Sequence, residues 1–283
     1  MEGTANPLKL PARALLIAEI GENHAGDLQM ARRLIAEAAR AGADIVKFQS
    51  YRGMDVAVED PERDWFGQVE LSDAMHRELQ ATAEQGGVEF LSSPFTLERA
   101  RYLCEDLGLS KIKIASSEML NFPLLDYVNR RAQTVFLSTG MATLEEVRQA
   151  VSHLSQPETI YLLHCVTQYP AQDEETNLNA IPTLASAFPH CSIGYSDHTL
   201  GIDAPVAAVA LGATVIEKHF TLAKNFPGTD HLLSATPEEF AEMTKRIRRV
   251  EAFKGNGLKE PTSGEREIRD FVRKRWRKQE PVR

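Results

Sequence analysis

Cysteine, long apolar runs and excess positive charge are all scarce in this sequence. Its 283 residues include three cysteines, Cys104, Cys165 and Cys191, which are far apart and show no Cys-x-x-Cys spacing. Neither a disulfide scaffold nor a structural zinc site is therefore indicated. We expect all three to be buried, reduced thiols.

Long apolar runs would be needed to cross a membrane or to direct secretion. No run reaches the roughly 18 residues that span a bilayer, and Met1 to Thr4 lack the basic and apolar regions of a signal peptide. The net charge of −8 argues against nucleic-acid binding, because phosphate backbones are bound by clustered Lys and Arg. We expect a cytoplasmic protein with neither a membrane nor a nucleic-acid partner. The basic run from Arg273 to Lys278 is predicted to be a solvated helical tail.

What the sequence does contain is a repeated alternation of short apolar runs and helical segments. The apolar runs cover residues 15–20, 44–48, 88–91, 112–115, 135–137, 160–164, 192–195 and 215–217. Helix-start signals lie between them, at Asp27, Ser72, Thr96, Thr143 and Thr236. Eight such units without a Gly-x-Gly-x-x-Gly turn favour a (β/α)8 TIM barrel over an open α/β sheet. We predict one domain over residues 1–283, with the barrel at about 14–255 and a C-terminal extension containing a basic helix at 256–283.

A barrel of this kind builds its active site at the carboxyl ends of its strands. His198 and His219 follow the last two apolar runs, so both imidazoles are expected at one mouth. Imidazole nitrogens that leave coordination positions open are typical of catalytic metal sites. The pair is predicted to hold a divalent metal, and two ordinary hydrogen-bonded histidines are the alternative. Asp197 is interpreted as an orienting group for a histidine or as a helix cap.

Lys47 and Lys113 lie in otherwise apolar strands, where an ammonium group needs a partner. A bound phosphate or carboxylate would satisfy both. One alternative is pairing with a barrel glutamate, such as Glu19, Glu118 or Glu217. Another is a Schiff-base lysine, because desolvation lowers the pKa of lysine. Four nearby hydroxyls favour the anion, as does the glycine that follows Ser138-Thr139; the hydroxyls belong to Thr96, Ser116, Ser138 and Ser196.

Two loops also carry candidate substrate contacts. Asp230 and His231 follow a flexible segment after the last strand, at the expected barrel mouth. His24, within Glu22-Asn23-His24-Ala25-Gly26, follows the first strand. For His24, substrate binding and loop structure explain the position equally well.

Six ordered motifs now identify a family. They are Ala18 to Gly26 (AEIGENHAG), Val46 to Gln49 (VKFQ), Lys113 to Glu118 (KIASSE), Leu137 to Met141 (LSTGM), Tyr195 to Thr199 (YSDHT) and Glu217 to Thr221 (EKHFT). Together they resemble the barrel domain of N-acetylneuraminate (sialic acid) synthases and their nonulosonate relatives. The resemblance runs from about residue 15 to 253.

The resemblance implies a reaction and a set of ligands. Phosphoenolpyruvate would condense with the open-chain aldehyde of an N-acylated amino sugar, giving a nine-carbon 2-keto-3-deoxy acid and phosphate. Manganese, or alternatively Mg²⁺ or Co²⁺, would bind His198 and His219. The residues that would hold phosphoenolpyruvate are Lys47, Thr96, Lys113, Ser116, Ser138 and Ser196. Those that would face the sugar are Glu19, Tyr169 and Asp230. Asn23 and His24, in the loop after the first strand, are further candidate sugar contacts.

Two carboxylates are predicted to be catalytic. The resemblance implies that Glu118 matches a carboxylate beside the reacting centre. Because Glu118 also follows the lysine-serine strand, we expect it to act as general acid and base. Glu19 is expected to act with it at the sugar.

Two departures from the family pattern stand out. Thr167-Gln168 occupies the place of a family asparagine, which puts that anion contact in question. The family usually adds a small antifreeze-like C-terminal domain that caps the partner's sugar site in a swapped dimer, and the resemblance here ends with the barrel. We therefore expect a differently held acceptor, a separate capping protein, or the basic run Arg273 to Lys278 in the capping role. A homodimer is expected from the resemblance.

Two other functions compete with this reading. The first is a barrel that condenses phosphoenolpyruvate with a different or phosphorylated aldose, as 3-deoxy-octulosonate-phosphate synthases do. Such an acceptor would require a further basic cluster at the mouth, and none is evident in the sequence. The second is a non-catalytic subunit that binds sugar or phosphate and needs a partner. The complete set of two histidines, two lysines and Glu118 favours catalysis.

Overall fold

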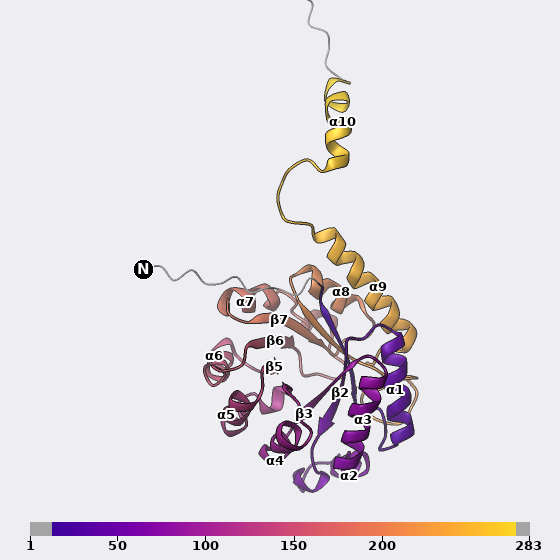
Figure 1. The fold of residues 1–283 in the computed structure, drawn as a ribbon, viewed down its shortest axis with the longest axis vertical. Helices are drawn as coiled ribbons and strands as arrows, with labels where there is room; N and C mark the ends of the chain where they lie inside the picture. The colour runs from indigo at the N-terminus through magenta and orange to yellow at the C-terminus, as the bar shows by residue number, and fades with distance from the viewer. Residues whose placement is uncertain (1–12, 276–283) are drawn as a thin grey trace, which may run out of the picture.

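Eight parallel strands form one sheet that curls into a nearly closed barrel (Figure 1). The computed structural model describes residues 13–275. The strands are β1 (Leu15–Gly21), β2 (Ile45–Ser50), β3 (Glu89–Pro94), β4 (Lys111–Ile114), β5 (Thr134–Ser138), β6 (Thr159–Cys165), β7 (Ser192–Asp197) and β8 (Val215–His219). Their order is β3-β2-β1-β8-β7-β6-β5-β4, and β3 contacts β4 without a hydrogen-bonded ladder. The predicted barrel and its eight strands are confirmed, with strand ends shifted by up to three residues.

Helices surround the sheet, except the last one, α10, which lies away from it, as Figure 1 shows. They are α1 (Leu28–Arg40), α2 (Arg63–Val69), α3 (Asp73–Gln85), α4 (Leu97–Arg101), α5 (Phe122–Arg131), α6 (Leu144–Ser152), α7 (Ala180–Ala187), α8 (Asp203–Ala210), α9 (Pro237–Lys254) and α10 (Ser263–Lys274). Short helical turns η1 (Gly53–Asp55), η2 (Tyr102–Asp106), η3 (Ser116–Glu118) and η4 (Asp173–Glu175) lie in connections. Each predicted cap accepts a hydrogen bond from the backbone of the helix it begins; these caps are Asp27, Ser72, Thr96, Thr143 and Thr236.

The core has an outer and an inner part, which follow from the alternation of side chains along each strand. Outward-facing residues pack against the helices, as Leu16 and Ala18 do together with Leu34 of α1. Inward-facing residues form a small apolar plug, which contains Ile17, Ile45, Leu91, Phe136, Tyr161, Leu163 and Val215. Further along the same inner faces the side chains become charged, from Ile17 to Glu19 and from Val215 to Glu217. The plug therefore closes the barrel beneath its charged carboxyl end.

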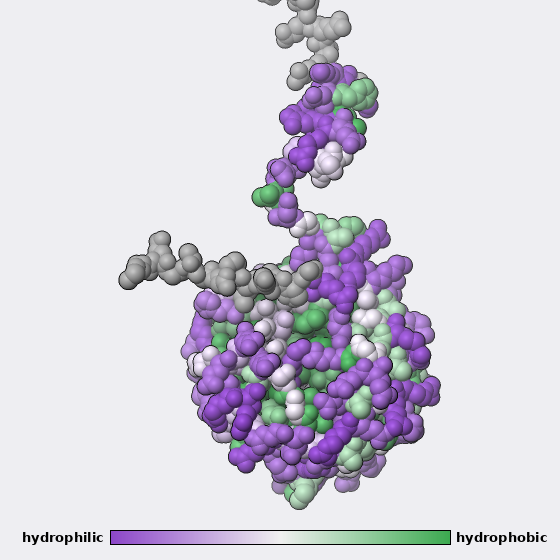
Figure 2. Space-filling model, in the orientation of Figure 1, coloured by the Kyte–Doolittle hydropathy of each residue, from purple (hydrophilic) through white to green (hydrophobic). Residues whose placement is uncertain are grey.

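The C-terminal extension is a separate exposed helix, α10. In Figure 2 the visible face of the barrel is mostly hydrophilic, and α10 carries both hydrophilic and hydrophobic side chains. Arg273 and Lys274 end this helix, whereas the rest of the predicted basic run, Trp276 to Lys278, lies outside the described residues, as do Met1 to Thr4. Within residues 13–275, no helix combines the length and apolar character needed to cross a membrane. All three cysteines are unpaired thiols, with Cys165 and Cys191 buried and Cys104 half-buried.

Candidate active site

A cavity of about 870 Å³ opens at the carboxyl ends of the strands. Of the fourteen residues predicted for the site, twelve line this cavity: Glu19, Lys47, Thr96, Lys113, Ser116, Glu118, Ser138, Tyr169, Ser196, His198, His219 and Asp230. Strand alternation and register bring the innermost of them together. Glu19 of β1 is directly opposite Lys47 of β2 and His219 of β8. The structure thus gathers at one mouth residues that are up to about two hundred positions apart in the chain.

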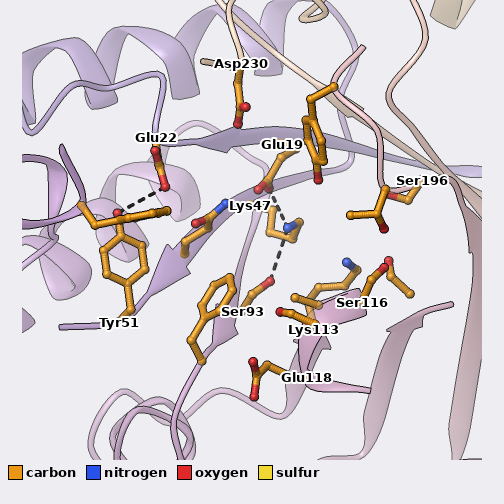
Figure 3. A pocket seen from close by; sticks show the side chains of 18 of the residues that line it. Glu19, Glu22, Lys47, Tyr51, Ser93, Lys113, Ser116, Glu118, Ser196 and Asp230 are labelled. Atoms are coloured by element: carbon orange, nitrogen blue, oxygen red, sulfur yellow. Dashed lines mark hydrogen bonds and ion pairs between the residues drawn. The ribbon is translucent and has the colours of Figure 1, made fainter. Parts of the chain in front are cut away.

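Both buried lysines pair with glutamates, as one alternative from the sequence proposed. Lys47 Nζ lies 2.8 Å from Glu19 Oε2 and 3.8 Å from Glu217 Oε1. Lys113 Nζ lies 3.3 Å from the same Glu217 oxygen. Lys47 also donates to Ser93 Oγ at 3.3 Å (Figure 3). Glu217 therefore holds a position between the two ammonium groups, where the anion hypothesis placed a ligand.

These pairs shift the pKa values of the four groups in different directions. Burial raises the pKa of Glu19 while Lys47 opposes the shift. Burial also acts to raise the pKa of Glu217, but Lys113 and Lys47 outweigh it and bring the pKa to about 2. The pKa of Lys47 is raised, because Glu19 and Glu217 outweigh burial, whereas burial lowers the pKa of Lys113 despite Glu217. Lys47 and Glu217 are thus held charged at neutral pH, which does not suit Lys47 to Schiff-base chemistry.

A second corner of the cavity is built from hydroxyls. Gly140 N donates to Ser116 Oγ at 3.0 Å. A Cβ at Gly140 would lie 2.1 Å from Thr167 Oγ1 and 2.7 Å from Ser116 Oγ, so only glycine fits there. Ser138 Oγ and Thr167 Oγ1 are buried without a hydrogen-bond partner among the described residues. Buried polar atoms of this kind are costly unless a ligand or water satisfies them. Thr167 therefore supplies a hydroxyl to this corner.

Two further predicted hydroxyls line the cavity but are already engaged. Ser196 Oγ donates to Glu217 Oε1 at 2.9 Å. Thr96 Oγ1 accepts from Arg99 N at 3.2 Å as the cap of α4. The Thr96 hydroxyl still has its own hydrogen to donate, because a hydroxyl both donates and accepts.

The two histidines lie together on the cavity wall, with ring centroids 5.3 Å apart. His198 Nδ1 is 2.7 Å from the carbonyl oxygen of Val166, so Nδ1 carries the hydrogen and Nε2 keeps its lone pair. His219 Nδ1 is buried without an aligned hydrogen bond and lies 3.3 Å from Asp230 Oδ2. Burial acts to lower the pKa of His219, but Asp230 raises it, so a metal there would compete with a proton.

The imidazole nitrogens of His198 and His219 fit a metal site that keeps coordination positions open better than a structural site whose positions are all filled by the protein. Within residues 13–275, no group of three or more His, Cys, Asp or Glu side chains is placed to hold a metal ion. Two imidazoles would leave the remaining positions to substrate or water, as catalytic sites do. Tyr169 stacks on His198 with ring centroids 4.1 Å apart and is 48% exposed, which places it between the histidines and solvent.

Glu118 occupies the edge of the cavity rather than its centre. Its Oε2 accepts from Asn121 Nδ2 at 2.8 Å, and its side chain is half-buried. In Figure 3 it lies apart from the Glu19 and Lys47 pair, below Ser93 and Lys113. The central carboxylates are instead Glu19 and Glu217.

Asn23 and His24 do not line the cavity. Asn23 Nδ2 donates to the carbonyl oxygen of Phe220 and to Ser234 Oγ, both at 2.9 Å. His24 Nδ1 accepts from Gly26 N at 3.0 Å, and burial lowers the pKa of His24 to about 4. Both side chains fix the loop after β1, because a buried polar group in such a loop has its hydrogen bonds met by neighbouring backbone. These bonds match the loop-structure reading of His24, and contact of either side chain with the sugar stays a prediction.

Several lining residues were not among the predicted site residues. Glu217 could have been found from the alternation Val215, Glu217, His219, which puts all three on the inner face. Glu22 is buried and accepts from Trp65 Nε1 at 2.6 Å. No sequence signal places Trp65 there, because it comes from α2 in the connection between β2 and α3.

The chain is similar to known proteins over most of its length. The NeuB family model matches residues 34–259. The chain is 41% identical to the N,N'-diacetyllegionaminic acid synthase of Campylobacter jejuni over 281 residues, covering 93% of the chain and 84% of that protein. It is 37% identical to the N-acetylneuraminate-9-phosphate synthase of Homo sapiens over 261 residues, covering 87% and 72%. The crystal structure of N-acetylneuraminic acid (sialic acid) synthetase from Leptospira borgpetersenii in complex with citrate superposes with a TM-score of 0.88 at 35% identity, covering 94% of this chain and 93% of that one.

Proposed function

Because the chain belongs to the NeuB family of phosphoenolpyruvate-dependent condensing synthases, we propose that it joins phosphoenolpyruvate to the open-chain aldehyde of an N-acylated amino sugar. The products would be a nine-carbon 2-keto-3-deoxy acid and phosphate. The family resemblance seen in the sequence motifs is confirmed. The acceptor, the metal, the homodimer and a separate capping protein stay predictions.

The observation that carries the proposal is the unsatisfied hydroxyl corner beside Lys113. Ser138 Oγ and Thr167 Oγ1 are buried without hydrogen-bond partners among the described residues, and the missing side chain of Gly140 lets the Thr167 and Ser116 hydroxyls lie close to its backbone. Short hydroxyls beside an ammonium group match the needs of a phosphate or carboxylate. Since Glu19 and Glu217 already pair with the two lysines, the ligand is recruited by these donors as much as by charge. This corner supports the assignment of phosphoenolpyruvate binding to Lys47, Thr96, Lys113, Ser116, Ser138 and Ser196.

The proposed reaction makes one carbon–carbon bond and breaks one ester bond. Carbon 3 of phosphoenolpyruvate attacks the aldehyde carbon, and the aldehyde oxygen takes up a proton. Water then adds at carbon 2 and loses a proton, and phosphate departs as the ketone forms. Holding the two reactants in line contributes about 7 to 11 kcal/mol in ideal cases, so positioning is the main task of the lysines and hydroxyls.

Proton transfer is assigned to two carboxylates. Glu19 lies at the centre of the cavity beside Lys47, where it can serve the aldehyde oxygen. Glu118 at the edge, oriented by Asn121, is proposed as general acid and base for the phosphoenolpyruvate side. Tyr169 and Asp230 are proposed to contact the sugar, because both line the cavity near the histidines.

His198 and His219 are proposed to hold a divalent metal, with Mn²⁺ preferred and Mg²⁺ or Co²⁺ as alternatives. The lone pair left on His198 Nε2 and the poorly satisfied Nδ1 of His219 support this assignment. When bound, such an ion would supply a Lewis acid for the aldehyde oxygen.

The test is phosphate release from phosphoenolpyruvate with Mn²⁺, screened over N-acetylmannosamine and its di-acetamido dideoxy relatives. Release that depends on the sugar is expected, and Ser138→Ala should raise KM for phosphoenolpyruvate about ten- to hundredfold because a hydrogen bond to a charged ligand is lost. Ser186→Ala on α7, whose hydroxyl bonds to Pro182 O, is the matched control. Glu118→Gln should lose at least about a hundredfold in kcat. Absence of release with every aldehyde would favour a non-catalytic binding subunit.

A further inference from the structure

The helix α10 differs from the other α-helices because none of its residues is buried. Every residue from Thr262 to Arg275 is exposed. Figure 1 shows α10 away from the barrel, joined to α9 by the connection from Gly255 to Thr262. Its apolar side chains are open to solvent, with exposed fractions of 56% for Ile268, 66% for Phe271 and 46% for Val272.

Helical spacing places these three apolar side chains on one side of α10. Ile268, Phe271 and Val272 are separated by three and four positions, as neighbours along one face of a helix are. Three polar residues with the same spacing lie on the opposite side: Arg266, Asp270 and Arg273. Figure 2 shows the hydrophobic side chains of α10 gathered toward one side of the helix. The helix is therefore amphipathic, and its apolar side is not buried against any other described segment.

Positive charge is concentrated in the second half of α10 and in the sequence that follows it. Residues 269–278 contain six lysines or arginines and one acid, in a chain whose net charge is −8. Four of these cations belong to the described and exposed residues: Arg269, Arg273, Lys274 and Arg275. The surface around the apolar side chains thus has the opposite charge to the chain as a whole.

The helical form of α10 is stabilised by its own residues. Thr262 N donates to Glu265 Oε2 at 2.8 Å, and Glu265 N donates to Thr262 Oγ1 at 3.3 Å, which completes a capping box. Arg273 and Lys274 lie in the last turn, where cations interact favourably with the helix dipole. A preformed helix loses less conformational entropy on binding than a segment that must fold first. The amphipathic side is therefore available for binding as it stands.

An apolar side flanked by cations matches the surface of an anionic lipid bilayer. Such helices lie in the bilayer interface, with the apolar side among the headgroups and the cations at lipid phosphates. Arg275 lies over the Phe271 ring, with Cζ 5.0 Å from the ring centroid, so a cation directly borders the apolar side. A nucleic acid would use the cations but leave Ile268, Phe271 and Val272 in water. The barrel is set apart from α10 in Figure 1, so its negative charge does not have to approach the bilayer.

We propose that α10 binds the surface of anionic lipid bilayers, through the apolar side formed by Ile268, Phe271 and Val272 and the cations from Arg269 onward. This binding is independent of the condensing reaction. It replaces the expectation from the sequence of a solvated tail and of no membrane partner. The contact is peripheral, because no helix within residues 13–275 is long and apolar enough to cross a bilayer.

The experiment measures how much of the full chain sediments with lipid vesicles. One set of vesicles is phosphatidylcholine alone, and the other contains about one-third phosphatidylglycerol. We expect binding to the anionic vesicles to be at least about tenfold tighter than to the neutral ones, because each cation near the surface adds attraction. Binding should weaken at 0.5 M salt, since screening reduces that attraction.

Two double variants separate the apolar from the charged contribution. Ile268→Gln with Phe271→Gln should lower the affinity for anionic vesicles at least about tenfold, because the apolar area that enters the interface is lost. Arg273→Gln with Lys274→Gln should lower it by a similar factor. Glutamine keeps a high helix propensity, so α10 stays helical in both variants, which circular dichroism checks.

Matched controls come from α9. Phe253→Gln changes a phenylalanine that is 71% exposed, and Lys245→Gln with Arg246→Gln removes two adjacent, exposed cations. Both controls should bind vesicles as the unmodified chain does. Equal losses in the controls and in the α10 variants would overturn the proposal.

Other results would also overturn it. One is failure to sediment with anionic vesicles, and another is equal binding to neutral vesicles. Vesicle binding that the Ile268 and Phe271 variant leaves unchanged would make α10 a general polyanion site. Without vesicle binding, light scattering that shows a dimer lost in this variant would assign the apolar side to a second copy of the chain, and a raised KM for the sugar would assign α10 to the barrel mouth.

Discussion

Two buried ion-pair networks, on opposite faces of the same barrel wall, differ in how completely their atoms are satisfied. Outside the barrel, Lys218 Nζ donates to Asp197 Oδ2 and to the carbonyl oxygen of Thr199, both at 2.6 Å. Asp197 Oδ1 accepts from the Tyr195 hydroxyl, Thr199 N and Thr199 Oγ1. Lys218 and Asp197 are fully buried. The charged atoms of this network all have partners, so we call the network closed. Asp197 belongs to it and neither orients His198 nor lines the cavity.

The inner network, which joins Glu19, Lys47, Lys113 and Glu217, is open. Glu217 Oε2 is buried without a hydrogen bond among the described residues, and Ser138 and Thr167 nearby have unpartnered hydroxyls. Desolvating charges costs several kcal/mol per ion, which only good geometry and further hydrogen bonds repay. A network that leaves such atoms unmet beside a cavity is organised for a ligand, whereas a closed one holds strands together.

Lys113→Met tests the open network and should have the largest effect. We expect kcat/KM for phosphoenolpyruvate to fall by about a hundred- to a thousandfold, as losses of preorganised charge at reacting groups do. Stability should change little, because Glu217 keeps Lys47 as a partner. Phosphate release and urea unfolding measure the two quantities. Strong destabilisation with retained activity would show that the inner network stabilises the fold and does not bind the ligand. The contrast between the two networks would then be wrong.

Lys218→Met tests the closed network. Removing one partner leaves Asp197 buried and uncompensated, so the free energy of unfolding should fall by about 3–5 kcal/mol. Lys224→Met is the control, since the Lys224–Glu239 pair is partly exposed and is expected to contribute less than about 1 kcal/mol. Denaturant unfolding measures both. Equal losses in the two variants would contradict the closed-network assignment.

His76 sharpens the comparison, because its Nε2 is buried and unpartnered but lies outside the cavity. Burial lowers the pKa of His76 from 6.5 to about 4. The unfolded chain therefore binds a proton below pH 6.5 that the native protein excludes until about pH 4, so stability is lost as the pH falls through this window. From pH 7 to 5 His76 contributes about 2 kcal/mol to this loss, and His76→Phe should remove that share, while the similar share of His24 stays.

The measurement for His76 is urea unfolding at a series of pH values. Exposed His190→Gln provides the control and should follow the unmodified protein. If His76→Phe shows the same loss between pH 7 and 5 as the unmodified protein, His76 is not the group responsible.

Pairing within the site was the part least accessible from the sequence. Three glutamates were available to the lysines, and only the register of β1, β2 and β8 selects Glu19 and Glu217 over Glu118. Asn23 follows Glu22 directly, yet Glu22 lines the cavity and Asn23 bonds to Phe220 and Ser234. Neighbours in a turn point in different directions, and no local pattern reports which one faces inward.

The sequence by itself determined the barrel, its eight strands, the helix caps and most residues at the strand ends. These depend on short-range rules, namely alternation along a strand, side-chain caps and the shared mouth of parallel strands. Only the tertiary structure decided which network is closed and which is open, and which acids line the cavity. Those outcomes depend on contacts between segments distant in the chain, such as Trp65 with Glu22 and Arg52 with Glu70 and Asp73, and on the burial that sets their energies.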